Sequence, residues 1–187
     1  MGPSDAELVQ RCLAGDNAGF DLLVRKYQRQ VHGLCYRMLG DADEAADAAQ
    51  ESFIKAYHAL ESFRQDAQFL TWVTRIARNA CLDSVRRRAV RQADSIDDDE
   101  SGAGSLPSGA PSPEEAALRS DAKRRLDAAI LDLPESHRAA LVMFHFSGLT
   151  ISEISRALGR PEGTVKSDLH HARERLRRRL EGVEVSL

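Results

Sequence analysis

The segment from residue 91 to residue 112 constrains the fold of this chain most strongly, because it contains very few large apolar side chains that a hydrophobic core could bury. It carries five acidic residues against one arginine and is otherwise rich in Gly, Ser and Pro. Such a composition predicts a flexible, self-repelling linker, since an ordered loop of this length would be unusual. The 187 residues therefore divide into two small domains, residues 1–90 and residues 113–187.

Both domains are predicted to be helical. Ser4, Asp41 and Thr150 are each followed three positions later by Glu, which is the spacing of a capping box. Apolar residues recur at intervals of three and four, and no segment of useful length alternates as a strand would. The expected helices cover about residues 5–13, 17–39, 42–60, 69–88, 113–131, 134–147, 151–158 and 161–180. The fold class is therefore all-α, with two small helical domains joined by a flexible acidic linker.

The last two expected helices have the layout of a helix-turn-helix. A short helix ends at Gly159, and a longer cationic helix follows after Pro161. In such a unit the second helix enters the major groove of duplex DNA. Its predicted outer face carries Lys166, Ser167, His170, His171 and Arg173, with further arginines toward the C-terminus. The alternative is an ordinary helical hairpin with a solvated basic face.

A second basic surface is expected on the helix at residues 69–88. Its outer stripe carries Arg75, Arg78, Asn79 and Arg86. Phe63, Phe69 and Trp72 lie beside this stripe in the sequence. Cations next to aromatic rings suit single-stranded nucleic acid, whose bases stack on the rings. The stronger alternative is that Phe69 and Trp72 belong to the core, and we expect both interpretations to hold in part, with Trp72 mostly packing.

An acidic stripe is expected on the helix at residues 42–60. It is formed by Asp43, Asp47, Gln50, Glu51 and Ile54, opposite the buried alanines. One apolar residue among acids and an amide is typical of a docking face for a basic partner helix. The alternative is a face that is only solvated.

Other classes of protein find little support. The chain has no P-loop, GxSxG or HExxH motif, so neither an enzyme, a cofactor nor a metal site is expected. Its three cysteines form no CxxC pair and are expected to be buried thiols. No apolar run is long enough to span a bilayer and no secretion signal is visible, so we expect no membrane insertion and a cytoplasmic protein. The net charge of −3 averages over acidic and basic segments.

Two long motifs resemble a known family. Residues 41–53 (DADEAADAAQESF), 69–72 (FLTW) and 75–79 (RIARN) look like region 2 of bacterial RNA polymerase sigma factors. Residues 148–150 (GLT) and 162–167 (EGTVKS), with Leu133-Pro134 and Arg138, resemble region 4. A chain with these two regions and only a short linker between them is similar to the extracytoplasmic-function (ECF) group.

The resemblance implies a role for each surface. The acidic stripe would dock on the clamp of the polymerase β′ subunit, and the β subunit is a further expected partner. Phe63, Phe69, Trp72, Arg75, Arg78, Asn79 and Arg86 would recognise and melt the minus-ten promoter element. Thr164, Lys166, Ser167, His170, His171 and Arg173 would read the minus-thirty-five element as duplex. The linker would thread the RNA-exit path, and an anti-sigma partner is expected.

Two positions depart from the family, whose members usually have arginine at Asp168 and at His171. Asp168 would either repel DNA or accept a hydrogen bond from a cytosine amino group, so altered promoter preference is a hypothesis. A competing interpretation is a sigma-like mimic that sequesters an anti-sigma protein without binding DNA; its basic stripes and aromatic loop count against it. A stand-alone helix-turn-helix repressor would leave the first domain unexplained.

Overall fold

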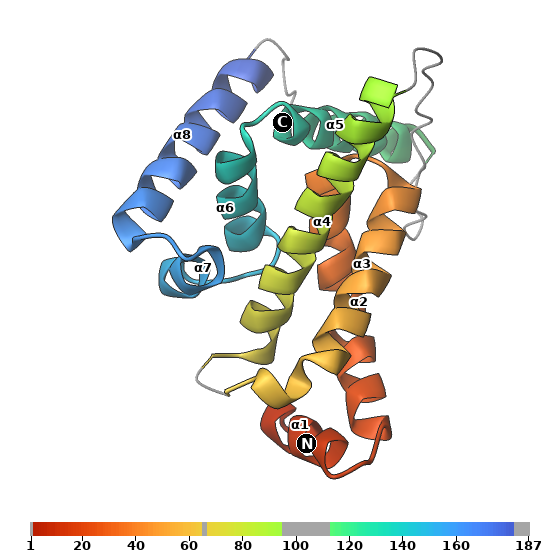
Figure 1. The fold of residues 1–187 in the computed structure, drawn as a ribbon. Helices are drawn as coiled ribbons and strands as arrows, with labels where there is room; N and C mark the ends of the chain where they lie inside the picture. The colour runs from red at the N-terminus through yellow and green to blue at the C-terminus, as the bar shows by residue number, and fades with distance from the viewer. Residues whose placement is uncertain (1, 65–66, 95–112, 182–187) are drawn as a thin grey trace.

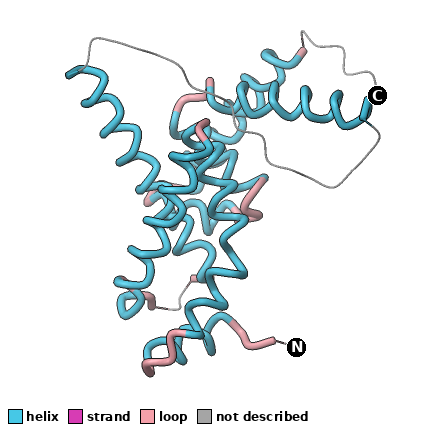
Figure 2. The backbone as a smooth tube through the Cα atoms, turned by 90° about the vertical axis from the view of Figure 1, so that its right-hand side faces the viewer, coloured by secondary structure: helices cyan, strands magenta, loops and turns pink. Residues whose placement is uncertain are grey.

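The computed structural model describes residues 2–64, 67–94 and 113–181, with side chains for 2–64, 67–90 and 121–181. Within these ranges every regular element is a helix and none is a strand, which confirms the all-α fold (Figure 1, Figure 2). The elements are α1 (Asp5–Leu13), α2 (Ala18–Leu39), α3 (Ala42–His58), the short 3₁₀ helix η1 (Leu60–Ser62), α4 (Phe69–Asp94), α5 (Pro113–Leu131), α6 (Glu135–His145), α7 (Ile151–Leu158) and α8 (Glu162–Leu180).

Local sequence signals start and stop these helices as predicted. The capping boxes at Ser4 and Thr150 are complete, with both reciprocal hydrogen bonds formed. At α3 the Asp41 carboxylate accepts from the Glu44 N–H at 2.8 Å, which is half of the predicted box. The glycines at the ends of α2, α6 and α7 adopt positive φ values, between 63° and 80°, a conformation that other residues adopt only at a cost.

Helices α1 to α4 form the first lobe. α2, α3 and α4 pack against one another, and α1 and η1 close one end (Figure 1). Most of the large apolar residues of these helices are buried, but Tyr57 and Val85 are exposed at 40% and 38%. Tyr57 lies at the edge of the core, where its hydroxyl donates to the Asn17 side chain at 2.9 Å and its ring meets Phe20 edge-on.

The last helix of the first lobe is longer than expected. α4 continues to Asp94, past the predicted domain end at residue 90. Arg, Gln and Ala follow residue 90 and are good helix formers, so the helix extends into a segment that composition assigned to the linker. The rest of the predicted linker, residues 95–112, lies outside the described residues.

The second lobe, α5 to α8, packs directly on the first. α6 contacts α2, α7 contacts α4, and α5 crosses from the end of α2 to α8 (Figure 1). The buried apolar residues of the two lobes form one contiguous cluster. Arg138 connects the lobes, because its guanidinium donates to the carbonyl of Met38 at 2.6 Å and to the carbonyls of Leu131 and Leu133 at 2.5 and 3.0 Å. The described parts of the two lobes thus form one packed body.

The three cysteines are buried free thiols, as expected. In the part of the chain that the structure describes, no helix combines the length and the apolar character needed to cross a bilayer. Nor do those residues include a group of three or more side chains that could hold a metal ion.

Candidate nucleic-acid interface

The α7–α8 pair forms the predicted helix-turn-helix. α7 ends at Gly159, whose left-handed conformation turns the chain before α8 begins. Val165, Leu169 and Ala172 bury one side of α8, which packs on α6 and α7. On the other side Lys166, Ser167, His170, His171 and Arg173 are exposed, and Thr164 is half-buried. The structure therefore brings all six predicted minus-thirty-five residues to one accessible helix face.

Arg173 is held in place by α6. Its guanidinium lies 3.2–3.3 Å from the His145 imidazole and 5.4 Å from the centroid of the Phe144 ring. Proximity to Arg173 and burial both lower the pKa of His145, with burial the larger cause. A neutral His145 can accept from Arg173, so this arginine points along the helix surface with a defined orientation.

Asp168 does not belong to the DNA-facing surface, which corrects the expectation from the sequence. It is only 6% exposed, and its carboxylate accepts from Arg160 at 2.5 Å and lies 3.7 Å from the His137 imidazole. Asp168 is three positions after the buried Val165, so it shares the packed side of the helix. From that position it cannot pair with a base, and its negative charge is paired with Arg160.

The aromatic residues predicted to contact the minus-ten element form a packed cluster. Phe69 is 1% exposed and lies within 5.7–6.4 Å of the ring centroids of Phe20, Tyr27, Phe63 and Trp72. Phe63 is 8% exposed. No base can stack on these two rings in this arrangement, so their direct role is packing. Trp72 is half-buried, 5.0 Å from Phe63, and offers the accessible ring.

The basic stripe of α4 is divided between solvent and the second lobe. Arg75, Asn79 and Arg86 are exposed. Arg78 instead donates two hydrogen bonds to one carboxylate oxygen of Glu135 in α6, at 2.7 and 3.0 Å, and its side chain is 20% exposed. Close by, the hydroxyl of Thr71 donates to Glu153 of α7 at 3.3 Å. The second lobe therefore covers part of the predicted minus-ten surface.

The predicted docking stripe is also divided. Gln50 and Ile54 line an open, mainly apolar groove of about 980 Å³ between α2 and α3. Asp43 and Asp47 are exposed. Glu51 faces α4, where it pairs with Lys55 at 2.8 Å and Arg87 at 3.2 Å. The hydrogen bond from Lys55, followed by that from Arg87, lowers the pKa of Glu51. The pair with Arg87 links α3 to α4.

The α2 wall of this groove was missed by the sequence analysis. It contributes Phe20, Val24, Gln28, Arg29 and His32. The exposed Leu22 and Ile54, at 40% and 51%, add apolar surface on the two helices. The acidic stripe belongs to α3 alone, whereas the groove exists because α2 and α3 lie side by side.

Comparison with known proteins gives consistent matches. The family model for Sigma-70 region 2 matches residues 23–91, and that for Sigma-70 region 4 matches residues 123–176. The chain is 41% identical to the RNA polymerase sigma-H factor of Pseudomonas aeruginosa over 95% of its own length and 94% of the relative's. It is 34% identical to the ECF RNA polymerase sigma factor SigW of Bacillus subtilis, covering 92% and 94% of the two chains.

Among solved structures, the fold is similar to the sigma factor RpoE of Bartonella quintana in its complex with the anti-sigma factor NepR. The TM-score is 0.72 at 21% identity, covering 90% of this chain and 98% of that one.

Proposed function

Because the chain belongs to the extracytoplasmic-function group of the sigma-70 family, we propose that its two lobes divide the reading of the promoter. As a member of that group, the chain is a transcription initiation factor that directs core RNA polymerase to promoters, and it is not an enzyme. Residues 1–90 would dock on the polymerase and melt the minus-ten element, and residues 113–187 would read the minus-thirty-five element. The observation that carries this assignment is the exposed face of α8 from Lys166 to Arg173.

The α8 face suits duplex DNA. It presents donors and acceptors on the first turns of the second helix of a helix-turn-helix, where side chains reach base edges. The arginines farther along α8 would contact phosphates and add a salt-dependent, sequence-independent term to the affinity.

The α4 face suits a separated strand. Arg75, Asn79 and Arg86 are exposed for phosphate and base contacts, and Trp72 offers a ring for stacking. Phe63 and Phe69 would support Trp72 from beneath. Unstacking a base costs a few kcal/mol, which these contacts must offset.

The packed arrangement of the lobes is proposed to be the state before promoter binding. The two promoter elements are separated by about 25 base pairs, or roughly 85 Å along B-DNA, whereas a compact chain of this size is about 40 Å across. Both elements therefore cannot be contacted at once in the packed form. The polymerase would hold the lobes apart at a fixed spacing, so that two weak readers bind as one bivalent unit.

The groove between α2 and α3 is the proposed docking site for the β′ clamp. Gln50 and Ile54 would contact the clamp within it, and Asp43 and Asp47 would attract basic residues at its edge. Contact of the second lobe with the β subunit is proposed from the family alone.

An anti-sigma partner and a cytoplasmic location complete the proposal. The similar Bartonella structure is a complex with an anti-sigma factor, which makes such a partner reasonable here. A factor that binds the polymerase is expected in the same compartment as the polymerase, which is the cytoplasm. The alternative is a mimic that only sequesters an anti-sigma protein. It is disfavoured because such a mimic would not need the exposed, DNA-reading face of α8.

Run-off transcription with core polymerase tests the proposal. The reconstituted holoenzyme should give promoter-dependent transcripts whose start sites define the two elements. A variant with Ser167, His170 and His171 all changed to Ala should lose these transcripts, whereas Lys123→Ala, an exposed change on α5, should not. If the natural chain gives no promoter-dependent product, the mimic is the better interpretation.

A further inference from the structure

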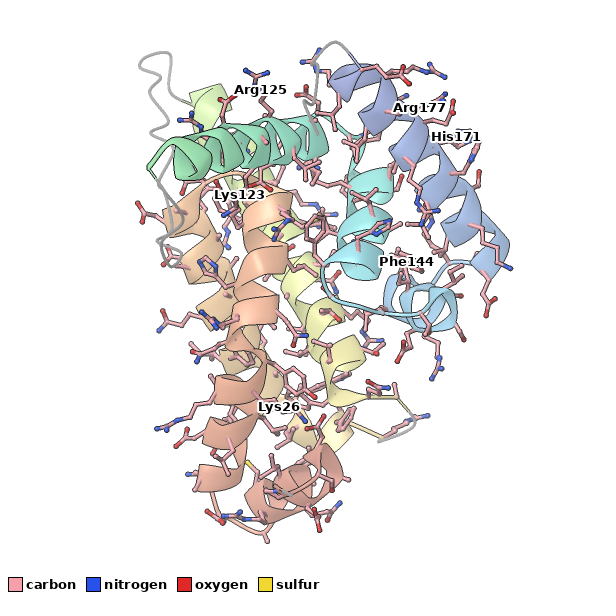
Figure 3. The ribbon with its side chains drawn as sticks, turned by 180° about the vertical axis from the view of Figure 1, so that it is seen from behind. Lys26, Lys123, Arg125, Phe144, His171 and Arg177 are labelled. Atoms are coloured by element: carbon pink, nitrogen blue, oxygen red, sulfur yellow. The ribbon has the colours of Figure 1, made fainter. Side chains whose placement is uncertain are left out.

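Three histidines meet where α6 lies against the proposed DNA-reading face of α8. The His137 and His171 rings are stacked, with centroids 5.8 Å apart and planes inclined by 25°. The His170 ring follows, 5.5 Å from His171. Figure 3 marks His171 on α8, beside α6. His137 belongs to α6, outside the helix-turn-helix, and no sequence motif pointed to it.

His137 occupies a confined site. Its side chain is 18% exposed, its Nε2 lies 3.7 Å from the Asp168 carboxylate, and Asp168 is fixed in turn by Arg160. Its Nδ1 is buried and has no hydrogen-bond partner among the described residues. The place of the ring is therefore set by packing and by the Asp168 carboxylate.

The surroundings of His137, burial above all, favour its neutral form. Burial is the largest cause that lowers its pKa; Asp168 opposes this, while Arg175, His171 and Arg160 act in the same direction as burial. A neutral imidazole can stack on the His171 ring as an uncharged aromatic partner, whereas an imidazolium would place a positive charge against that ring.

We infer that His137 is a positioning residue for base recognition, which holds the His171 imidazole in one orientation toward the major groove. This inference rests on the proposed reading of the minus-thirty-five element by α8. A histidine on an exposed helix face samples several rotamers, and fixing one of them on binding costs free energy. A stacked partner on a second helix removes that freedom before DNA arrives, so that one orientation, and with it one hydrogen-bonding pattern, meets the base edge.

The test is base preference, measured with full-length holoenzyme on a library of promoters randomised over the minus-thirty-five element. His171→Ala identifies the base positions that this residue reads. His137→Ala should weaken the preference at those same positions by about threefold, the factor that a stacked pair provides, and leave the other positions unchanged. His137→Phe, which keeps a ring to stack, should restore most of the preference. The double variant His137→Ala/His171→Ala should equal His171→Ala alone.

Several results would overturn the inference. A His137→Ala holoenzyme with unaltered preference, or with a uniform loss at all positions, would show that His137 only stabilises the lobe. If His137→Ala does not fold, His137→Gln replaces it, because Gln keeps a polar group of similar reach without the ring. The proposed function fails in a different way: the natural holoenzyme would then select no minus-thirty-five sequence at all, and His171→Ala would change nothing.

Discussion

Replacing Glu135 by glutamine should make the free chain bind the minus-ten strand more tightly. In the packed arrangement Glu135 accepts both hydrogen bonds from Arg78, one of the proposed minus-ten contacts. The substitution keeps the size and an acceptor oxygen of the side chain and removes only its charge. It therefore weakens the packed form relative to a form with separated lobes in which Arg78 is accessible.

The magnitude follows from the burial of the pair. A hydrogen bond to a charged partner contributes about 1 kcal/mol more than a neutral one, and exposed ion pairs contribute less than that. Arg78 is 20% exposed and Glu135 41% exposed. We therefore expect Glu135→Gln to weaken the packed form by slightly less than about 1 kcal/mol. That value corresponds to a change of about threefold to fivefold in the equilibrium between packed and separated lobes.

The measurement is the Kd of the free, full-length chain for a labelled single-stranded minus-ten oligonucleotide at fixed salt. Glu181→Gln is the matched control, because it removes the same charge from a residue that pairs with Arg177 in the same lobe. If Glu135→Gln binds the strand no more tightly than Glu181→Gln does, then Arg78 is not withheld from DNA by the packing of the lobes, and the reasoning is wrong.

Individual contacts give further predictions. Asp168→Asn should lower the free energy of unfolding by about 1–3 kcal/mol, because Arg160 loses a buried charged partner; urea denaturation measures this, and an unchanged stability would contradict it. The pKa of Glu51 is lowered from its ordinary value of 4.5, so its stabilising contribution is complete above about pH 4.5 and is lost as the pH falls through the lowered folded-state pKa. Acid titration of stability should accordingly be shallower for Glu51→Gln than for the natural chain. Phe69→Ala should lower the free energy of unfolding by about 3 kcal/mol. Trp72→Ala should reduce the opening of promoter DNA, measured by permanganate footprinting, while it lowers the thermal unfolding temperature of the protein only slightly.

The helices themselves could be predicted almost completely from the sequence. Capping boxes at Ser4 and Thr150 formed as expected, and α7 ended at Gly159 as predicted. These signals act within a single turn, where the distance between interacting groups is set by the helix and not by the rest of the fold. The exposed face of α8 was predictable for the same reason, because the periodicity of the helix decides which residues share a side.

The partners of long charged side chains could not be predicted in this way. The sequence placed Asp168 on a DNA-facing surface and Glu51 on a docking stripe, but each bonds a neighbouring helix or turn. Arg78 and Glu135 are 57 positions apart. Whether such side chains meet depends on how two helices cross, and no local pattern encodes the crossing.

The two helical domains were thus determined by the sequence alone, because the linker has nothing to bury and the apolar spacing on either side is helical. Only the tertiary structure decided that the lobes pack together, that this packing covers Arg78, and that a groove opens between α2 and α3. The physical reason is that these two kinds of interaction act over different separations along the chain. Backbone hydrogen bonds and helical periodicity are short-range and repeat along the chain, whereas contacts between lobes depend on side-chain shape and charge at positions that only the folded chain brings together.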